Sequence, residues 1–539
     1  MQLTEPDALR SASAQGFVLE KLALAFLTAP KKPKHWNIFK AELRDMEMLD
    51  VPIFEHFVDS TDLSLPHGMG KVQGLIEISG LESCRTRLRK LNLDDIDLQL
   101  RLIRGVSNAR WIQLDATSVV HTDDRLATAN QSVGESTTKH PQQSLTEKAR
   151  LQEAARIAAN LQRDAISVEH GRIDWLGLSL GDDSVRMSYG LLDPSMYSGT
   201  SGIAVFFAAL GPVHLPLARA CVSETLELAL NGHAGLLWRW WRDQPLGING
   251  CGGTLLALEI LSKLDAAQAD RYSTAADRLI GALQADRLTV DKEFDIMAGC
   301  SGLIGALLRR GTLQSIALAK KAGDHLIASQ NERGGWTLPN KQCYLGFAHG
   351  SAGICAALSA LYGVTGEMRF VQKIALSLSL EQTYFHKQSN NWLTYIDGKS
   401  PPRTTWCHGA PGIALSRLCL LSNNVTAAQI GTRAYAQVQS DLDLSLNTTA
   451  NFRSATPLDH LCCGTFGRSG ILRLAGRTTE ASQIDLIAYT AATQQGGLYG
   501  FGHTALVETP SLFRGSAGVG LSLLQSPCVS TVLSAGLLG

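Results

Sequence analysis

The sequence predicts an all-α protein built as a seven-fold (α/α) toroid of inner and outer helices, preceded by a mostly helical N-terminal segment. Three observations lead to this prediction. A glycine turn followed by an apolar run recurs seven times, amphipathic segments alternate with these runs, and 45% of the 539 residues are hydrophobic although only 6% are aromatic. Small aliphatic side chains in this proportion suit closely packed helices better than a β-sandwich.

The repeat consists of a glycine, two further residues, a second glycine and a short apolar run. Its first glycine stands at Gly199, Gly250, Gly299, Gly350, Gly409, Gly464 and Gly515. These glycines are 51, 49, 51, 59, 55 and 51 residues apart. A period of this length indicates a repeat architecture, in which each unit buries its apolar face against its neighbours.

The apolar runs predict inner helices, and the segments between them predict outer helices. A run such as "GIAVFFAALG" is hydrophobic on all sides, which is typical of a fully buried helix, and it lacks the β-branched alternation of a strand. Between the runs, apolar residues recur at three- and four-residue spacing with charges opposite. This pattern predicts outer helices over residues 145–166, 266–287, 314–330 and 426–443.

The glycine turns allow the inner helices to close into a ring. The first glycine of each repeat lets the chain turn without a Cβ clash, and the second lets neighbouring backbones approach closely. We therefore expect a closed toroid of seven helix pairs. Its glycine turns should gather at one end, around a central cavity.

The N-terminal part of the chain does not share the repeat. Its patterns predict helices over residues 18–27, 36–46 and 87–106, with a break at Pro52, since proline cannot continue a helix. A polar stretch over residues 128–144 follows, and its lack of apolar periodicity is typical of a linker.

The linker divides the chain into three predicted parts. A helical domain covers residues 1–127, the linker covers 128–144, and the toroid covers 145–539. At this length, two or three domains are expected.

Charge and hydropathy exclude several classes of partner. Lys plus Arg and Asp plus Glu number 49 each, so we expect no nucleic-acid partner. The most apolar stretches have about half the length that spans a bilayer, and the N-terminus lacks a signal-peptide pattern. We therefore expect a cytoplasmic protein without a stable membrane span. Its eleven cysteines should then be reduced thiols, most of them small core residues.

Several reactive or charged side chains stand close to the glycine turns. They are Asp295, His349, Arg403, Cys407, His408, Cys462 and Cys463. If the ring closes, the repeat brings all of them to one rim. Three cysteines on adjacent turns favour a catalytic zinc site, in which three protein ligands leave a fourth position open.

Alternative interpretations of these residues remain at this point. A single cysteine at a helix start is usually a packing residue, as Cys251 and Cys300 illustrate. His408 could replace Cys463 as the third ligand. His349 could be a hydrogen-bonded core or capping histidine. Asp295 and Arg403 could form an ordinary salt bridge or cap helices.

Four motifs resemble those of lanthionine synthetase C-like cyclases. They are "WCHGAPG", "CCGTFGRSG", "GFAHGSAG" and "DIMAGCSG", and the resemblance covers roughly residues 185–539. The double cysteine, and the histidine after Cys407, are similar to the cyclase domains of class II bifunctional lanthipeptide synthetases. Many other relatives have histidine at the position of Cys463.

The resemblance implies a zinc-dependent lanthipeptide cyclase. Its zinc ligands would be Cys407, Cys462 and Cys463, and its acid would be His349, supported by Asp295 and Arg403. Apart from the resemblance, His408 is a second candidate for the role of His349 or of Arg403. Such an enzyme adds peptide cysteine thiols to dehydroalanine or dehydrobutyrine, giving (methyl)lanthionine thioether rings. Its partner would be a dehydrated precursor peptide.

The start of the chain resembles the end of the dehydratase domain in the same bifunctional enzymes. The segments "LDVPIFEHF" and "DLQLRLIRG" carry this weaker resemblance. Phosphoryl transfer needs a phosphate cradle and metal-binding carboxylates, and the sequence before the linker shows neither. We therefore expect no dehydratase activity here, a separate dehydratase as partner, and a chain that is a truncated product, a fragment or one half of a split enzyme.

Two other functions remain open on the sequence alone. A protein of this fold could add glutathione to damaged proteins instead of closing peptide rings. It could also be an inactive scaffold that binds a peptide. The dehydratase-like segment argues against the first alternative, and the intact set of metal and acid residues argues against the second.

Overall fold

The computed structural model describes most of the chain. The described residues are 36–48, 50–119, 144–168, 171–180, 187–232, 234–396, 400–452, 458–501, 507 and 509–538. The chain divides into two compact units, residues 1–101 and residues 102–539. The helix expected over 18–27, and the linker expected over 128–144 except for its last residue, lie outside the described residues. The division at residues 127 and 144 stays a prediction.

The described part of the first unit contains short helices and one small hairpin. Its elements are α2 (Trp36–Glu47), β1 (Leu63–Ser64), β2 (Lys71–Val72) and α3 (Gly80–Lys90), and α4 (Leu93–Val119) begins there. The helix expected over 36–46 is confirmed as α2. The segment 87–106 is helical except at Leu91 and Asn92, between α3 and α4, where the Asn92 side chain accepts a hydrogen bond from the Asp95 N–H.

The second unit contains the predicted inner helices. In the described part of the chain they are seven: α7 (Thr200–Ala209), α11 (Cys251–Leu264), α14 (Cys300–Arg310), α16 (Ser351–Thr365), α18 (Ala410–Ser422), α21 (Thr465–Leu474) and α23 (Ser516–Leu523). Each begins one residue after the first glycine of its repeat. Their side chains are almost all buried, as expected for helices that are apolar on every face.

Outer helices alternate with the inner ones along the chain. They are α6 (Glu147–Asp164), α8 (Leu215–Cys221), α9 (Ser223–Asn231), α10 (Ala234–Asp243), α12 (Ala269–Ala282), α13 (Ala285–Thr289), α15 (Leu313–Ser329), α17 (Ile374–Thr383), α19 (Ala427–Ile430), α20 (Thr432–Asn451) and α22 (Thr478–Gln494). The four predicted amphipathic segments all coincide with outer helices. α6, for example, buries one face only, with Ala154, Ile157, Ala158 and Leu161.

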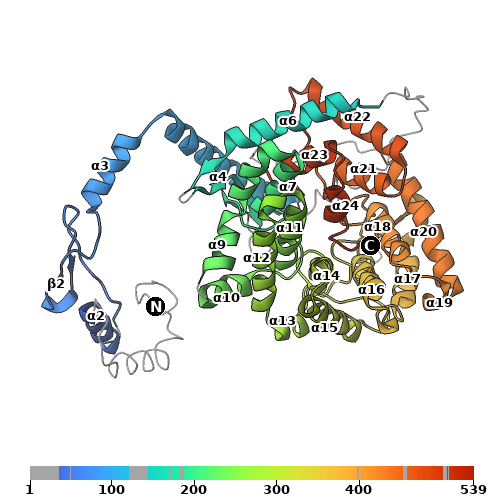
Figure 1. Cartoon of the computed structure of the whole chain (residues 1–539), viewed down its shortest axis with the longest axis horizontal. Helices are drawn as coiled ribbons and strands as arrows, with labels where there is room; N and C mark the ends of the chain where they lie inside the picture. Colours follow the sequence, from blue (N-terminus) through green and yellow to red (C-terminus); the bar gives the residue numbers. More distant parts are fainter. Residues whose placement is uncertain are drawn as a thin grey trace. The chain divides into compact units, whose positions relative to one another are not determined.

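The inner helices form a closed ring. Each packs against the next one along the chain from α7 to α23, and α23 packs against α7. The outer helix that packs against α23 is α6. The first outer helix of the chain therefore pairs with the inner helix of the last repeat. Figure 1 shows the inner helices, coloured from green to red, surrounded by the outer ones. The predicted all-α toroid is therefore confirmed.

Backbone hydrogen bonds join the loops that precede the inner helices. They run from Phe513 N to Tyr197 O (3.1 Å), Cys462 N to Phe513 O (2.9 Å), Trp406 N to Cys462 O (3.0 Å), Ala348 N to Cys407 O (3.2 Å), Ile296 N to Ala348 O (3.0 Å) and Ile248 N to Ile296 O (2.9 Å). A side-chain hydrogen bond of 3.2 Å from Ser198 to Asn249 links the two remaining neighbours. These bonds hold all the glycine turns at one end of the ring.

The C-terminal segment lies against the other end of the ring. Arg309, at the end of α14, donates hydrogen bonds of 3.0 Å to the carbonyls of Gly536 and Leu538. Asn423, which follows α18, donates one of 3.0 Å to the Leu537 carbonyl. A Cβ atom on Gly305 would lie 2.0 Å from the Ala535 carbonyl oxygen, so α14 needs glycine there.

A buried ion network joins one inner helix to two outer ones. Arg417 on α18 is 0% exposed and pairs with Glu381 on α17 at 2.5 Å and with Asp441 on α20 at 2.8 Å. The Ser351 hydroxyl donates a further hydrogen bond of 2.6 Å to Glu381. Because every charge has an opposite partner, this network is tolerated inside an apolar ring.

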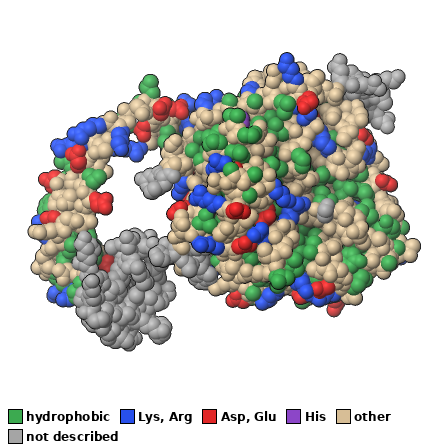
Figure 2. All heavy atoms as spheres, in the orientation of Figure 1, with side chains coloured by type: hydrophobic (Ala, Val, Ile, Leu, Met, Phe, Trp, Pro, Cys, Tyr) green, Lys and Arg blue, Asp and Glu red, His purple; other side chains and the backbone are tan. Residues whose placement is uncertain are grey.

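The second unit also contains short hairpins, which were not predicted from the sequence. They pair β3 (Ile166–Ser167) with β4 (Ile173–Asp174), β5 (Leu176–Leu180) with β6 (Met187–Leu191), and β7 (Phe385–His386) with β8 (Asn391–Trp392). Basic and acidic side chains are interspersed over the face of the toroid in Figure 2. Among the helices of the described ranges, none combines the length and the apolar character that a membrane crossing requires.

Candidate active site and metal centre

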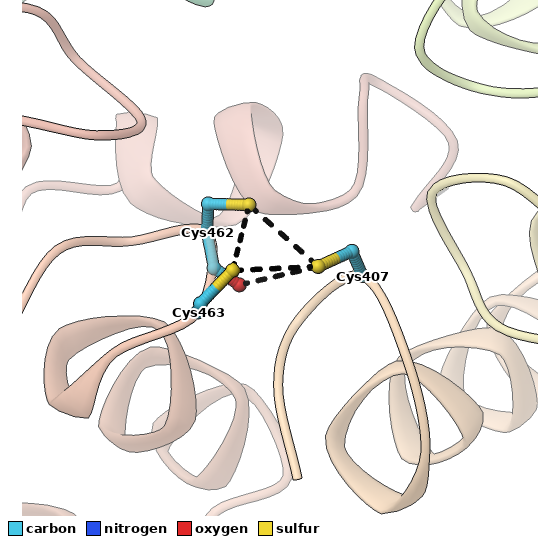
Figure 3. A group of neighbouring side chains, drawn as sticks. All are labelled: Cys407, Cys462 and Cys463. Atoms are coloured by element: carbon cyan, nitrogen blue, oxygen red, sulfur yellow. Dashed lines mark hydrogen bonds between the residues drawn. The ribbon is translucent and has the colours of Figure 1, made fainter. Parts of the chain in front are cut away.

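Three thiols meet where two adjacent glycine turns lie side by side. Cys407 precedes α18, and Cys462 and Cys463 precede α21. The Sγ atom of Cys407 lies 3.6 Å from that of Cys462 and 3.6 Å from that of Cys463, and the last two are 3.4 Å apart. Figure 3 shows the three sulfurs pointing toward one another. We call this group the thiol cluster.

The spacing of the thiol cluster fits a tetrahedral metal. Zinc binds thiolates at about 2.3 Å, which places tetrahedral sulfur ligands about 3.8 Å apart. The observed separations of 3.4–3.6 Å are close to this value. Ligands that are all sulfur select a soft or borderline metal such as zinc. His408, the alternative third ligand, is not part of the group.

The thiols of the cluster differ in their acidity. Hydrogen bonds from Cys462 and Cys463 hold the pKa of the Cys407 thiol well below its usual value. The pKa values of the other two thiols are raised, chiefly because each faces Cys407. The three thiols therefore titrate as one coupled group, in which the first proton leaves more easily than the others, and a bound metal would draw off all of them.

Neighbouring groups fix the thiol cluster in place. The Thr405 hydroxyl lies 3.3 Å from the Cys407 sulfur. The Nδ1 atom of His460 accepts a hydrogen bond of 3.1 Å from the Cys463 N–H. Burial, together with the nearby charge of Arg514, lowers the pKa of His460 to about 3, so its ring stays neutral and can accept this bond. The sequence analysis did not foresee His460.

Glycine is required at one of these turns. Gly409, between His408 and α18, has φ +72°, a conformation that side chains rarely adopt. A Cβ atom there would lie 1.7 Å from the Arg403 carbonyl oxygen. The conformation of the Cys407–His408 turn therefore depends on this glycine.

His349 and Asp295 form a hydrogen-bonded pair next to the thiol cluster. The Nδ1 atom of His349 lies 2.8 Å from Asp295 Oδ2. The other oxygen of Asp295 accepts hydrogen bonds from the N–H groups of Ala298 (2.7 Å) and Gly299 (3.1 Å), so the carboxylate is rigidly held. Asp295 is 2% exposed, whereas the His349 side chain is 36% exposed. The imidazole is therefore oriented by a buried carboxylate and reachable on its other side.

Asp295 also sets the charge of His349. Burial by itself lowers the pKa of His349, but the hydrogen bond and the negative charge of Asp295 outweigh burial, and the pKa lies above its ordinary value. Cys407 contributes in the same direction. A histidine with a raised pKa keeps its proton near neutral pH, which suits a general acid.

His408 lies beside His349 but differs from it in charge. The centroids of the two rings are 5.6 Å apart. Burial lowers the pKa of His408 to about 4, although the charge of Cys407 acts in the opposite direction. Among the described groups, its Nδ1 atom has no hydrogen-bond partner. Arg403 lies close enough to His408 for its charge to lower that pKa further. A neutral His408 is a weaker candidate for the acid than His349.

Aromatic residues that the sequence analysis missed line the two histidines. The Tyr344 ring lies 6.0 Å from the rings of both His349 and His408. Tyr395 contacts Tyr344 edge to face at 4.9 Å. On the other side, Tyr197 lies near Cys462, and burial together with the charge of that cysteine raises the pKa of Tyr197. Tyr344 and Tyr395 do not directly precede a glycine turn, so the repeat gave no signal for them.

The fold and the site together define a class of protein, a helical toroid that carries a thiol cluster and a histidine–carboxylate pair on its glycine turns. The model of one family, described as lanthionine synthetase C-like protein, matches residues 190–534. This match covers well over half of the chain. The chain belongs to the lanthionine synthetase C-like family.

Two individual proteins are similar to this chain. The lacticin 481/lactococcin biosynthesis protein LcnDR2 of Lactococcus lactis subsp. lactis is 20% identical over 458 residues, which are 84% of this chain and 46% of that protein. The chain thus spans about half the length of this curated relative. The solved structure of nisin cyclase matches 73% of this chain and 98% of its own, at 16% identity and a TM-score of 0.49.

Proposed function

We propose that this protein is a zinc-dependent lanthipeptide cyclase. It adds peptide cysteine thiols to dehydroalanine or dehydrobutyrine and so closes (methyl)lanthionine thioether rings. The observation that carries the proposal is the thiol cluster, with sulfurs 3.4–3.6 Å apart, beside the His349–Asp295 pair. Membership of the lanthionine synthetase C-like family supports it.

The thiol cluster would hold the metal. Zinc bound by Cys407, Cys462 and Cys463 would supply a deprotonated, fixed thiol nucleophile, because a coordinating thiol loses its proton. Thr405 and His460 keep the cysteines in place through the contacts described above.

His349 would act as the general acid. When the substrate sulfur attacks the β-carbon, a carbon–sulfur bond forms and the double-bond electrons move toward the α-carbon and its carbonyl, giving an enolate. His349 then donates its proton to the α-carbon, and Asp295 holds the imidazole in position. Such an acid contributes about 10²–10⁴-fold to a rate. Arg403 would offset the enolate charge, with His408 as the second candidate for the acid.

The substrate we propose is a dehydrated precursor peptide. The relative LcnDR2 is described as a lacticin 481/lactococcin biosynthesis protein, which supports a role in peptide biosynthesis. In this proposal the protein works in the cytoplasm, and residues 1–127 are the helical tail of a dehydratase-like domain, joined by the linker over 128–144 to the cyclase over 145–539.

A separate dehydratase would supply the dehydrated residues. The test is to incubate this chain alone with an unmodified precursor, ATP and Mg²⁺, and to measure the peptide mass. We expect no change. Loss of water from Ser or Thr under these conditions would refute this division of labour.

Cyclisation itself leaves the peptide mass unchanged, so the test counts free thiols. A pre-dehydrated peptide is incubated with the protein, treated with a thiol-alkylating reagent and analysed by mass spectrometry. We expect alkylation to disappear with the wild type and to persist with Cys407→Ala. Adding glutathione to the same reaction separates the rival chemistry, because a glutathione adduct in place of a ring would overturn the proposal.

A further inference from the structure

The glycine repeat gives each loop an equivalent position directly before its first glycine. These positions are Ser198, Asn249, Ala298, His349, His408, Cys463 and Arg514. The ring of backbone hydrogen bonds places the loops side by side in this order. In four consecutive loops the position carries a reactive or charged side chain, and the proposed function assigns roles to the first three. Arg514 has no role so far.

The loop of Arg514 is bonded to the loop of the double cysteine. The Cys462 N–H donates a hydrogen bond of 2.9 Å to the Phe513 carbonyl, so the residues that follow, Cys463 and Arg514, occupy matching positions in adjacent loops. The Phe513 ring stacks on Tyr197 at 4.8 Å and contacts Trp406 at 4.9 Å, which anchors the loop of Arg514.

The charge of Arg514 acts on the thiol cluster. Arg514 is partly buried. Burial lowers its pKa, but Tyr197 and the three thiols of the cluster raise it, with a raised pKa as the net result. Its positive charge also acts on two neighbours on the same side of the cluster: it opposes the burial that raises the pKa of Tyr197, and it adds to the burial that lowers the pKa of His460.

The composition of the cluster creates a need for such a cation. Three thiolates on a divalent ion leave a net charge of about −1, and a substrate thiolate makes it about −2. If a neutral histidine stood in place of Cys463, the metal site would carry one negative charge fewer. Arg403 acts on His408, whereas the charge of Arg514 reaches Cys462, Cys463 and Cys407.

We propose that Arg514 is a positioning residue that favours binding of the substrate thiolate at the thiol cluster by offsetting the excess negative charge there. This proposal rests on the proposed function, because it assumes a metal at the cluster. Loss of Arg514 should therefore weaken binding of the substrate thiol more than binding of the metal, because Arg514 attracts the negative charge that the added thiolate brings.

The test uses the full chain with Co²⁺ at the cluster and 2-mercaptoethanol as the thiol probe. The sulfur-to-cobalt absorption band reports thiol binding without any cyclisation. We expect Arg514→Met to retain about one Co²⁺ per chain and to bind the probe about tenfold more weakly, and Arg514→Lys to stay within about threefold of the wild type. Arg369→Met is the matched control, since it removes an arginine from an exposed ion pair with Asp324.

The outcomes separate this proposal from the proposed function. Wild-type thiol affinity in Arg514→Met, with metal retained, would overturn the role of Arg514 alone. Absence of metal binding by the wild type would overturn the proposed function itself. If Arg514→Met does not fold, Arg514→Gln serves in its place. Equal weakening in the lysine variant and in the uncharged variant would also contradict an effect of charge.

Discussion

His349 and Asp295 are hydrogen bonded at 2.8 Å although 54 residues separate them in the chain. They stand in neighbouring glycine-turn loops, and the backbone bond from Ile296 N to the Ala348 carbonyl joins these loops directly beside the pair. The orientation of the imidazole is therefore a consequence of ring closure. A change in either residue should alter the chemistry without opening the ring.

Asp295→Asn should move the pH dependence of cyclisation. Asp295 raises the pKa of His349, and a general acid is active while it carries its proton, so the rate should fall as the pH rises through this pKa. Removing the carboxylate charge lowers the pKa, and the alkaline limb should therefore shift to lower pH. A rate profile measured across neutral pH checks this. An alkaline limb that stays at the wild-type pH would show that Asp295 does not set the pKa of the general acid.

His349→Asn should slow cyclisation by about 10²-fold or more while leaving the metal in place. Asparagine removes the proton donor, and the thiol cluster does not depend on His349 for any of its contacts. Single-turnover rates with a pre-dehydrated peptide, combined with metal analysis, measure both effects. Unchanged rates would transfer the role of the acid to His408 or to water.

Arg417→Met should destabilise the ring strongly. The substitution leaves Glu381 and Asp441 buried without their cation, and breaking a buried ion pair in this way costs about 3–5 kcal/mol in the free energy of unfolding. Urea unfolding followed by circular dichroism measures the change. Arg369→Met, at an exposed pair, should shift the midpoint little, and equal shifts in the two variants would contradict the account.

Asp174→Asn should stabilise the protein at neutral pH. Burial raises the pKa of Asp174 to about 6. Between about pH 4 and 6 the unfolded chain releases this proton and the folded chain keeps it, so stability falls as pH rises, by up to about 3 kcal/mol. The asparagine oxygen can still accept the hydrogen bonds of Trp175 and Leu192.

Thermal unfolding at two pH values checks this prediction. The variant should melt higher than the wild type near pH 7 and at about the same temperature near pH 3, where the carboxyl is mostly protonated in both states. An advantage that is equal at both pH values would point to packing instead of charge.

The architecture was predictable from the sequence because the repeat is regular. Each first glycine, such as Gly199 or Gly464, lies directly before an inner helix, so the spacing of glycines located every helix start. The same regularity placed Cys407 and Cys462 two residues before their glycines, in adjacent loops. Their meeting in space follows from ring closure alone.

Other parts of the site could not be predicted in this way. Tyr344 reaches the histidines from a loop position that the repeat does not mark, and His460 acts through a hydrogen bond to the Cys463 backbone. Neither residue has a distinguishing neighbour in the sequence. Arg514 could have been found, since it shares the position of His349 and Cys463 in its repeat.

The metal content of the purified protein decides whether the thiol cluster is a zinc site. We expect about one zinc per chain, lost in Cys407→Ala and in Cys462→Ala although both variants stay folded. Cys300→Ala is the matched control, because Cys300 is also buried at a glycine turn but lies outside the thiol cluster, and it should keep its zinc. Full zinc retention in both Cys407→Ala and Cys462→Ala would contradict the account.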